Sequence, residues 1–312
     1  MKTLADELQL EPTVSVKIAS IVPPNPGVAT PALPFSDPKH CISRDDIWNK
    51  MDETFASGNI CILRGIGGSG KTYAACKYAH QCMKYGQNVA WIKSDSLANA
   101  ESKYREYVVA VARHPANTGK FTDVHDLPFN QILTEIVQND IGRKFLLILD
   151  NVDDYTDVEH IVSAHSAANC KVLITTRCIL TPTNSIAPLD SILVSIPSEE
   201  ACILFFQSLE YRTISAEDAK KITDACNQLP LRIQVAARYL TKYQEKSVTS
   251  YLEAINIQKQ KKDVDPQIYP EVSLSIENLK EKHILAHNLL MLFVFLDPDY
   301  IYLNFVTDWI TW

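Results

Sequence analysis

The residues Gly65-Ile66-Gly67-Gly68-Ser69-Gly70-Lys71-Thr72 match the pattern G-x-x-x-x-G-K-[ST] in full. The chain has only 9 glycines in 312 residues, and four of them lie between positions 65 and 70. Glycine lets a backbone curl so that successive N–H groups point inward at one anion. This stretch therefore predicts a loop that holds phosphate groups.

The surroundings of this loop fit the same interpretation. An apolar run at 60–63 predicts a buried strand before it, and helical spacing at 72–85 predicts a helix after it, whose N-terminus attracts anions. Lys71 supplies a charge for the β- and γ-phosphates, and the Thr72 hydroxyl can ligate Mg²⁺. We expect the following residues to bind nucleotide: Gly65, Ile66, Gly67, Gly68, Ser69, Gly70, Lys71, Thr72 and Tyr73.

Two further residues follow predicted strands. Asp150 comes after the apolar run 145–149 and can hold Mg²⁺ opposite Thr72; the alternative is an acid that caps the next loop. Arg177 follows the run 171–175 and can reach the γ-phosphate, although an arginine there is equally consistent with a surface ion pair. Lys71, Asp150 and Arg177 are the candidate catalytic residues.

The pattern of elements predicts an α/β fold with a parallel sheet and helices on both faces, followed by helices alone after Pro197. We expect four regions: a proline-rich leader at 1–39, a nucleotide-binding domain at 40–197, a helical subdomain at 198–265 and a last segment at 266–312. The predicted strands are 60–63, 88–92, 145–149, 171–175 and 191–196. The predicted helices are 72–85, 97–112, 129–139, 201–209, 219–227, 231–243, 251–261 and 272–296.

Composition limits the other possibilities. Thirty basic and 37 acidic residues give a net charge of −7. The chain therefore lacks the excess of positive charge that is typical of proteins that bind bulk nucleic acid or membrane surfaces. The first residues include two acids instead of the apolar run of a signal peptide. Eight cysteines include no C-x-x-C pair, which argues against structural zinc and favours the reduced thiols of a cytoplasmic protein.

Six segments in this order resemble the NB-ARC domain, a nucleotide-binding module of the STAND class of P-loop signalling ATPases. They are 38–45, the loop 65–72, 145–154, 173–177, 228–231 (Gln-Leu-Pro-Leu, similar to G-L-P-L) and 272–279. The resemblance implies that ADP or ATP, with Mg²⁺, is the ligand. It also implies that Ile42, Arg44, Pro230 and Leu231 contact the nucleotide, and that 266–312 is an incomplete winged-helix subdomain.

The chain departs from that family at two places. The second acid expected after Asp150 is Asn151, and an amide cannot accept a proton at neutral pH. Asp153 or Asp154 could substitute through a water molecule, but capping of a loop is the commoner role. The downstream Met-His-Asp signature, whose histidine would clamp ADP, is absent from this sequence.

Together these features predict a regulatory switch in which the nucleotide controls domain packing and self-association, with at most slow ATP hydrolysis. A small-metabolite P-loop kinase is the alternative enzyme, and a module that binds nucleotide without hydrolysing it is a third reading. His283 and His287, four residues apart, are expected to form a polar helix face.

Overall fold

The computed structural model describes residues 33–34, 42–85, 87–114, 117, 119–121, 124, 126–138, 145–183, 185, 187–209, 214–261 and 269–296. The described residues belong to two compact units, which divide between Val248 and Thr249. The predicted leader at 1–39 lies outside the described residues except for Leu33 and Pro34. The four predicted region boundaries remain predictions.

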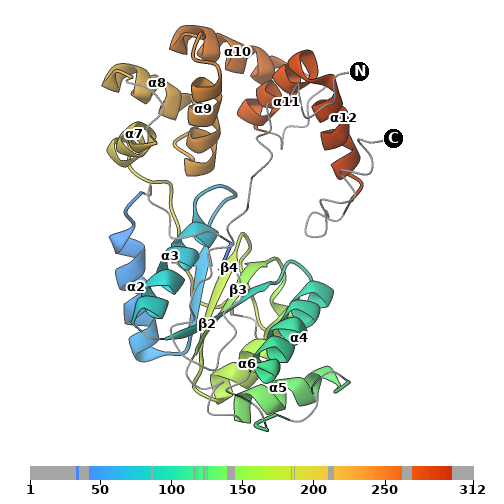
Figure 1. The fold of residues 1–312 in the computed structure, drawn as a ribbon. Helices are drawn as coiled ribbons and strands as arrows, with labels where there is room; N and C mark the ends of the chain where they lie inside the picture. The colour runs from blue at the N-terminus through green and yellow to red at the C-terminus, as the bar shows by residue number, and fades with distance from the viewer. Residues whose placement is uncertain are drawn as a thin grey trace. The chain divides into compact units, whose positions relative to one another are not determined.

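The first unit is built on a parallel sheet, as predicted (Figure 1). Its described strands stand in the order β2-β3-β4-β1-β5. Strand β4 therefore separates the strand before the phosphate loop, β1, from the strand that carries Asp150, β3. The strands are β1 (Ile60–Arg64), β2 (Asn88–Lys93), β3 (Phe145–Val152), β4 (Lys171–Thr176) and β5 (Ile192–Leu193).

Helices cover both faces of this sheet because alternate side chains of each strand point to opposite faces. Leu146 and Ile148 pack in a core with α2 (Asp45–Ser57) and α3 (Lys71–Lys84). Leu147 and Leu149 pack in a second core with the helices on the other side. Those helices are α4 (Leu97–Arg113), α5 (Phe129–Gln138) and α6 (Glu159–Ala167). Figure 1 shows α2 and α3 on one side of the sheet and α4, α5 and α6 on the other.

Four elements of this unit differ from the sequence predictions. Helix α2 was not predicted, although its buried Ile47, Met51 and Phe55 recur at a helical spacing of four. Helix α6 and the short 3₁₀ helix η3 (Tyr155–Asp157) were not predicted either. The strand predicted at 191–196 is limited to Ile192–Leu193, which pair with the end of β1.

Three helices complete the first unit: α7 (Glu199–Ser208), α8 (Ala216–Ala225) and α9 (Pro230–Lys242). Side-chain oxygens cap two of them, because Ser198 accepts the N–H of Ala201 and Ser215 accepts the N–H of Asp218. Pro230 occupies the first turn of α9, where its missing N–H costs nothing. The predicted run of helices after residue 197 is therefore present.

The second unit contains α10 (Val248–Gln260) from Thr249 onward, α11 (Pro270–Lys282) and α12 (Ile284–Phe293). The prediction of one continuous helix at 272–296 is wrong, because His283 has a non-helical backbone (φ −144°, ψ 71°) and ends α11. His283 consequently precedes α12, so it does not share a continuous helix face with His287. None of the described helices has the length and apolar character that crossing a bilayer requires.

Candidate functional site

The loop between β1 and α3 has a backbone that only glycine adopts easily. Gly68 and Gly70 have φ angles of 77° and 98°. Gly65 is restricted by space instead, since a Cβ there would lie 2.7 Å from the carbonyl oxygen of Val194. These three positions explain why a glycine-poor chain concentrates glycine here.

Lys71 begins α3 and folds back over the loop. Its Nζ donates to the carbonyl oxygens of Gly65 (2.8 Å) and Ile66 (2.9 Å). Burial lowers the pKa of the Lys71 ammonium, and the nearby Arg177 lowers it further, while Asp150 opposes both effects. The loop therefore gathers two cations, which favours a polyanionic ligand.

Asp150 is held from two sides by hydroxyl groups. Thr72 Oγ1 donates to Asp150 Oδ1 at 3.0 Å, and Thr175 Oγ1 donates to the same oxygen at 2.5 Å. Burial raises the pKa of Asp150, whereas these two hydrogen bonds and the charge of Lys71 lower it. The predicted pair Thr72 and Asp150 is thus in direct contact.

This pair has the chemistry of a Mg²⁺ site. Hydroxyl and carboxylate oxygens are ligands that Mg²⁺ prefers. Because Thr72 donates its hydrogen to Asp150, the lone pairs of its oxygen remain available to a cation. Both hydrogen bonds are accepted by Oδ1 of Asp150, and neither of them uses Oδ2. The residues present fit the ion that the loop implies.

Asn151 follows Asp150 in a left-handed conformation (φ 63°) and borders the same cavity. Its backbone N–H donates to Thr175 Oγ1 at 2.9 Å. Asp154 caps η3 by accepting the N–H of Thr156 at 3.0 Å, the ordinary role of a loop acid. Asp153 is exposed and does not belong to the described lining of the cavity.

A cavity of about 590 Å³ opens over the loop, within the size range of small-molecule sites. Most of the predicted binding residues line it, but Gly65, Ile66 and Asp150 do not. Asp150 lies behind Thr72 and Thr175, to which it is bonded. The described lining consists of Pro34, Ile42, Arg44, Trp48, Gly67, Gly68, Ser69, Gly70, Lys71, Thr72, Tyr73, Ala74, Asn151, Thr175, Arg177, Pro197, Phe205, Pro230, Leu231 and Gln234.

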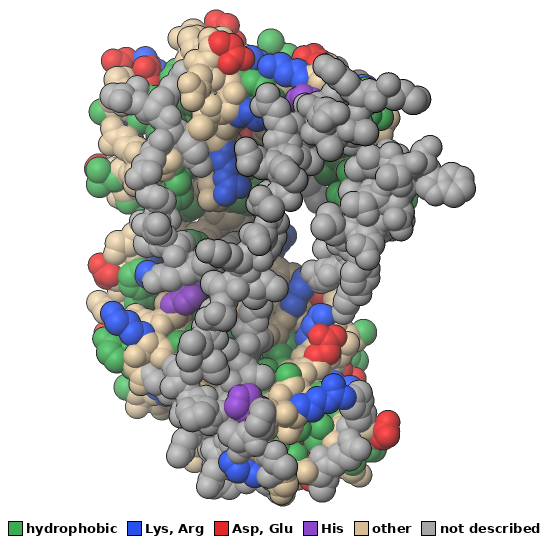
Figure 2. Space-filling model, in the orientation of Figure 1, with side chains coloured by type: hydrophobic (Ala, Val, Ile, Leu, Met, Phe, Trp, Pro, Cys, Tyr) green, Lys and Arg blue, Asp and Glu red, His purple; other side chains and the backbone are tan. Residues whose placement is uncertain are grey.

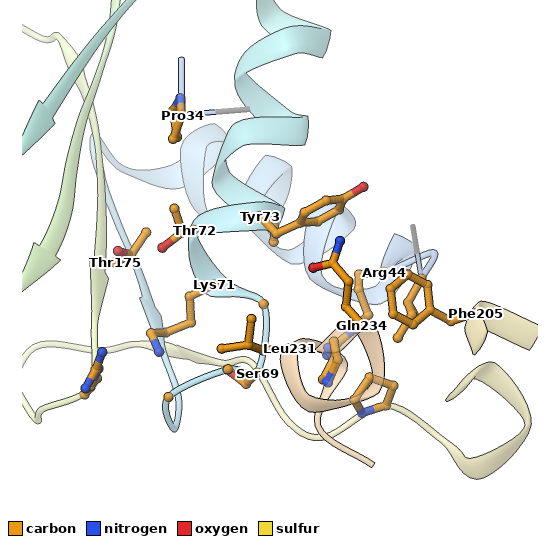
Figure 3. Close-up of a pocket in the computed structure, with 18 of the residues that line it drawn as sticks. Pro34, Arg44, Ser69, Lys71, Thr72, Tyr73, Thr175, Phe205, Leu231 and Gln234 are labelled. Atoms are coloured by element: carbon orange, nitrogen blue, oxygen red, sulfur yellow. The ribbon is translucent and has the colours of Figure 1, made fainter. Parts of the chain in front are cut away.

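The two ends of the cavity differ in chemistry. Figure 3 shows Lys71, Thr72 and Thr175 near one end and Arg44, Phe205 and Gln234 near the other. The first end is polar and cationic around the phosphate loop, whereas the second places the aromatic ring of Phe205 beside the polar side chains of Arg44 and Gln234. The first end suits the anionic part of a ligand, and the second offers an aromatic surface together with hydrogen-bonding groups.

Helix α9 closes the cavity against the loop. The N–H of Leu231 lies 3.4 Å from the carbonyl oxygen of Gly68, and Pro230 and Leu231 both line the cavity. Arg44, another lining residue, is held in place because its Nη1 donates to the carbonyl oxygen of Ser195 at 3.0 Å and its Nε donates to Oδ1 of Asp46 at 3.3 Å. A ligand in the cavity would therefore contact both the phosphate loop and α9.

Comparison with protein families identifies the module. The model of the NB-ARC domain matches residues 42–213, more than half of the chain. The chain belongs to the NB-ARC family. The predicted family and the predicted α/β P-loop fold are confirmed, and the chain contains the nucleotide-binding module of this family.

Comparison with solved structures found similar chains, two of which follow, and the first of these supports the fold of this NB-ARC chain. A Walker-type ATPase of Pyrococcus abyssi matches at 12% identity and a TM-score of 0.52, over 78% of this chain and 77% of that one. A STAND protein with a tetratricopeptide repeat sensor from Pyrococcus horikoshii matches at 14% identity and a TM-score of 0.43. The match covers 73% of this chain but only 34% of that protein. No curated protein matched the sequence.

Several residues of the NB-ARC site were not predicted. Thr175 was read only as part of a strand, and Trp48, Phe205 and Gln234 were not considered. No short motif identifies these last three, because they lie on α2, α7 and α9 and meet only after folding. The sequence contained one clue to Thr175: a hydroxyl side chain on a predicted buried strand, two residues before Arg177.

Proposed function

We propose that this NB-ARC chain is an ADP- and ATP-dependent regulatory switch, in which the nucleotide controls domain packing and self-association. The observation that carries the proposal is the shared cavity. The phosphate loop and Arg177 line one part of it, and Pro230, Leu231 and Gln234 of α9 line another. A nucleotide that spans the cavity couples the position of α9 to the state of the loop.

The proposal assigns roles to most of the predicted residues. The loop amides and Lys71 hold the β- and γ-phosphates, and Arg177 distinguishes triphosphate from diphosphate by the extra charge. Thr72 and Asp150 would hold Mg²⁺, which neutralises charge on the phosphates when it is bound. Ile42, Arg44, Pro230 and Leu231 contact the adenosine part. That the base is adenine is inferred from membership of the NB-ARC family.

Asn151 supports a second form of the same function, a module that binds nucleotide and does not hydrolyse it. The residue borders the cavity, where its amide cannot take a proton from water. The two forms differ only in turnover. Release of phosphate over hours that disappears in Asp150→Ala would support the hydrolysing switch.

The nucleotide is tested first. Mass spectrometry of the purified chain is expected to detect ADP or ATP, and Lys71→Ala is expected to lose it, since the loop then lacks its buried ammonium. Lys84→Ala is the matched control, because Lys84 is exposed at the other end of the same helix. Absence of adenine nucleotide, or equal retention in both variants, would refute the proposal.

The proposed switch is tested by measuring the oligomeric state of the chain with each nucleotide. Sedimentation of the chain with ADP and then with a non-hydrolysable ATP analogue is expected to show association only with the analogue. Identical sedimentation in both would leave a nucleotide-binding module without a switch. Arg177→Ala should remove the difference if this arginine senses the third phosphate.

We do not expect nucleic acid, a membrane or structural zinc to be a partner, and we propose a cytoplasmic location. The net charge of −7 supports the first two expectations. Among the described side chains on the face drawn in Figure 2, Lys and Arg are interspersed with Asp and Glu. A filter-binding assay with single- and double-stranded DNA at low salt would test this.

A further inference from the structure

The side chain of Thr175 makes two contacts that the proposed function leaves unexplained. Its Oγ1 donates to Asp150 Oδ1 at 2.5 Å and accepts the backbone N–H of Asn151 at 2.9 Å. The first distance is in the range of charge-assisted O–H···O⁻ bonds. One fully buried hydroxyl group therefore ties together two consecutive residues of β3.

The strand order makes this position special. Strand β4 lies between β1 and β3, so Thr175 stands between the strand that leads into the phosphate loop and the strand that carries Asp150. Thr175 pairs in register with Leu63 on β1. Thr72 approaches Asp150 from the loop side and Thr175 approaches it from the sheet.

The backbone of β3 needs this hydroxyl as well. The pairing of β3 with β4 shifts between Leu149 and Val152, which marks a bulge at Asp150 and Asn151. Asn151, with φ 63°, has its N–H directed to the Thr175 side chain instead of to a ladder carbonyl. Asn151 lies within this bulge and also lines the cavity.

The neighbouring hydroxyl serves a different purpose. Thr176 Oγ1 accepts the N–H of Cys178 at 2.9 Å and so shapes the turn that holds Arg177. Thr175 and Thr176 are consecutive on one strand, and their side chains point to opposite faces. The function of Thr175 is therefore not shared by its neighbour.

We propose that Thr175 is a positioning residue: its hydroxyl fixes the carboxylate of Asp150 for a nucleotide-bound Mg²⁺ and holds the left-handed backbone of Asn151 at the cavity wall. The proposal rests on the proposed function for its ligand. It predicts that loss of this hydroxyl weakens binding only when the cation takes part. A purely structural threonine would weaken binding with and without the cation alike.

The test uses three full-length variants. Thr175→Val removes the hydroxyl and keeps the shape, Thr175→Ser keeps the hydroxyl, and Thr223→Val is the matched control. Thr223 is also fully buried, and its hydroxyl donates to a carbonyl oxygen within α8. The measurement is the affinity for a non-hydrolysable ATP analogue by calorimetry, once with Mg²⁺ and once with EDTA.

In Thr175→Val the gain in affinity that Mg²⁺ provides should fall about tenfold, the lower end of the range for partners of metal ligands. The affinity in EDTA should stay within about twofold of the wild type. Thr175→Ser should recover most of the Mg²⁺ gain, and Thr223→Val should resemble the wild type. An unchanged Mg²⁺ gain in Thr175→Val, or an equal loss with and without Mg²⁺, would overturn the proposal.

Hydrogen exchange of the Asn151 amide separates this proposal from the proposed function. The amide should exchange more slowly in the wild type and in Thr175→Ser than in Thr175→Val. Equal exchange in all three overturns the positioning role even if ATP binds. A wild type that binds no analogue, with or without Mg²⁺, refutes the proposed function, and the exchange result still decides the role of Thr175 toward Asn151.

Discussion

Asn151 combines an unusual backbone with a side chain that borders the cavity. Its φ of 63° lies in the left-handed region, which asparagine and aspartate tolerate better than other non-glycine residues. An aspartate fits the same backbone and replaces the neutral amide with a carboxylate, which can accept a proton. Asn151 is therefore the residue at which turnover can be altered without changing the fold.

We predict that Asn151→Asp raises the rate of phosphate release at least tenfold, because a positioned general base contributes about 10²–10⁴-fold. The measurement is steady-state release of phosphate from ATP. Asp153→Asn is the control and should change the rate less than twofold, since Asp153 is exposed and absent from the described lining. A rate in Asn151→Asp equal to the wild type would show that the missing base does not limit turnover.

His165 gives the first unit a dependence on pH. Its Nδ1 lies 2.9 Å from the carbonyl oxygen of Ile161, and its Nε2 lies 3.2 Å from the hydroxyl of Tyr104. A carbonyl can only accept, so Nδ1 carries the proton of a neutral ring. Burial lowers the pKa of His165 from 6.5 to about 4. The unfolded chain therefore binds a proton below pH 6.5 that the folded chain does not.

We predict that the free energy of unfolding falls between pH 6.5 and pH 4 by about 3 kcal/mol through this group. Urea unfolding at several pH values measures the slope. Carboxylates titrate in the same window, so the informative quantity is the difference from His165→Gln. This variant should be less stable at pH 7.5 and should lose less stability on acidification. Parallel slopes would mean that the pKa of His165 is the same in the folded and the unfolded chain.

At the scale of elements, alternation of strands and helices was predictable because buried parallel strands are short apolar runs. β1, β2, β3 and β4 were predicted to within three residues at each end. The break at His283 was not predictable, since neither glycine nor proline marks it. Helix α6 is short and buries a histidine, so its apolar pattern is incomplete.

The candidate site divides in the same way. The phosphate loop was predictable because its conformation depends on the local backbone needs of Gly68 and Gly70. The part of the cavity near Phe205 and Gln234 was not, because these side chains come from separate helices and their meeting depends on packing. Thr175 belongs to the second kind, since its two hydrogen bonds require the order of the strands.

The turn between α8 and α9 shows how a glycine-poor chain ends a helix. Asn227 and Gln228 have φ angles of 53° and 56°. The N–H of Gln228 donates to the carbonyl oxygen of Thr223, and the N–H of Asn227 donates to that of Asp224, both at 2.9 Å. This pair of bonds is the Schellman motif, which usually has glycine at the first left-handed position.

We predict that Gln228→Gly stabilises the first unit by about 0.5–1 kcal/mol. Relief of the left-handed strain, about 1–2 kcal/mol, exceeds the entropy that glycine adds to the unfolded chain, about 0.4–1 kcal/mol. Asn227→Ala, the matched change, should destabilise by about 1 kcal/mol. The midpoints of urea unfolding measure both. A lower midpoint for Gln228→Gly would show that the glutamine side chain supplies contacts worth more than the strain.

At the scale of the whole molecule, the described lining of the cavity comes entirely from the first unit. The lining runs from Pro34 to Gln234, and the boundary between the units falls after Val248. In the proposed function the phosphates are bound by the loop, Lys71 and Arg177, which precede that boundary by about 70 residues or more in the sequence. Affinity for nucleotide should therefore be a property of the first unit.

We predict that a chain ending at residue 247 binds an ATP analogue within about threefold of the full-length affinity, measured by calorimetry. The same truncated chain with Lys71→Ala is the control and should not bind. The truncation removes α10, α11 and α12, so circular dichroism must first show that the remaining helices are folded. A loss of more than tenfold in a folded truncated chain would mean that residues 248–312 contribute to the site, because the loop and its cations remain intact. In that case the second unit would take part in holding the nucleotide, and the switch would have to be described as an exchange between the two units rather than as a movement of α9 alone.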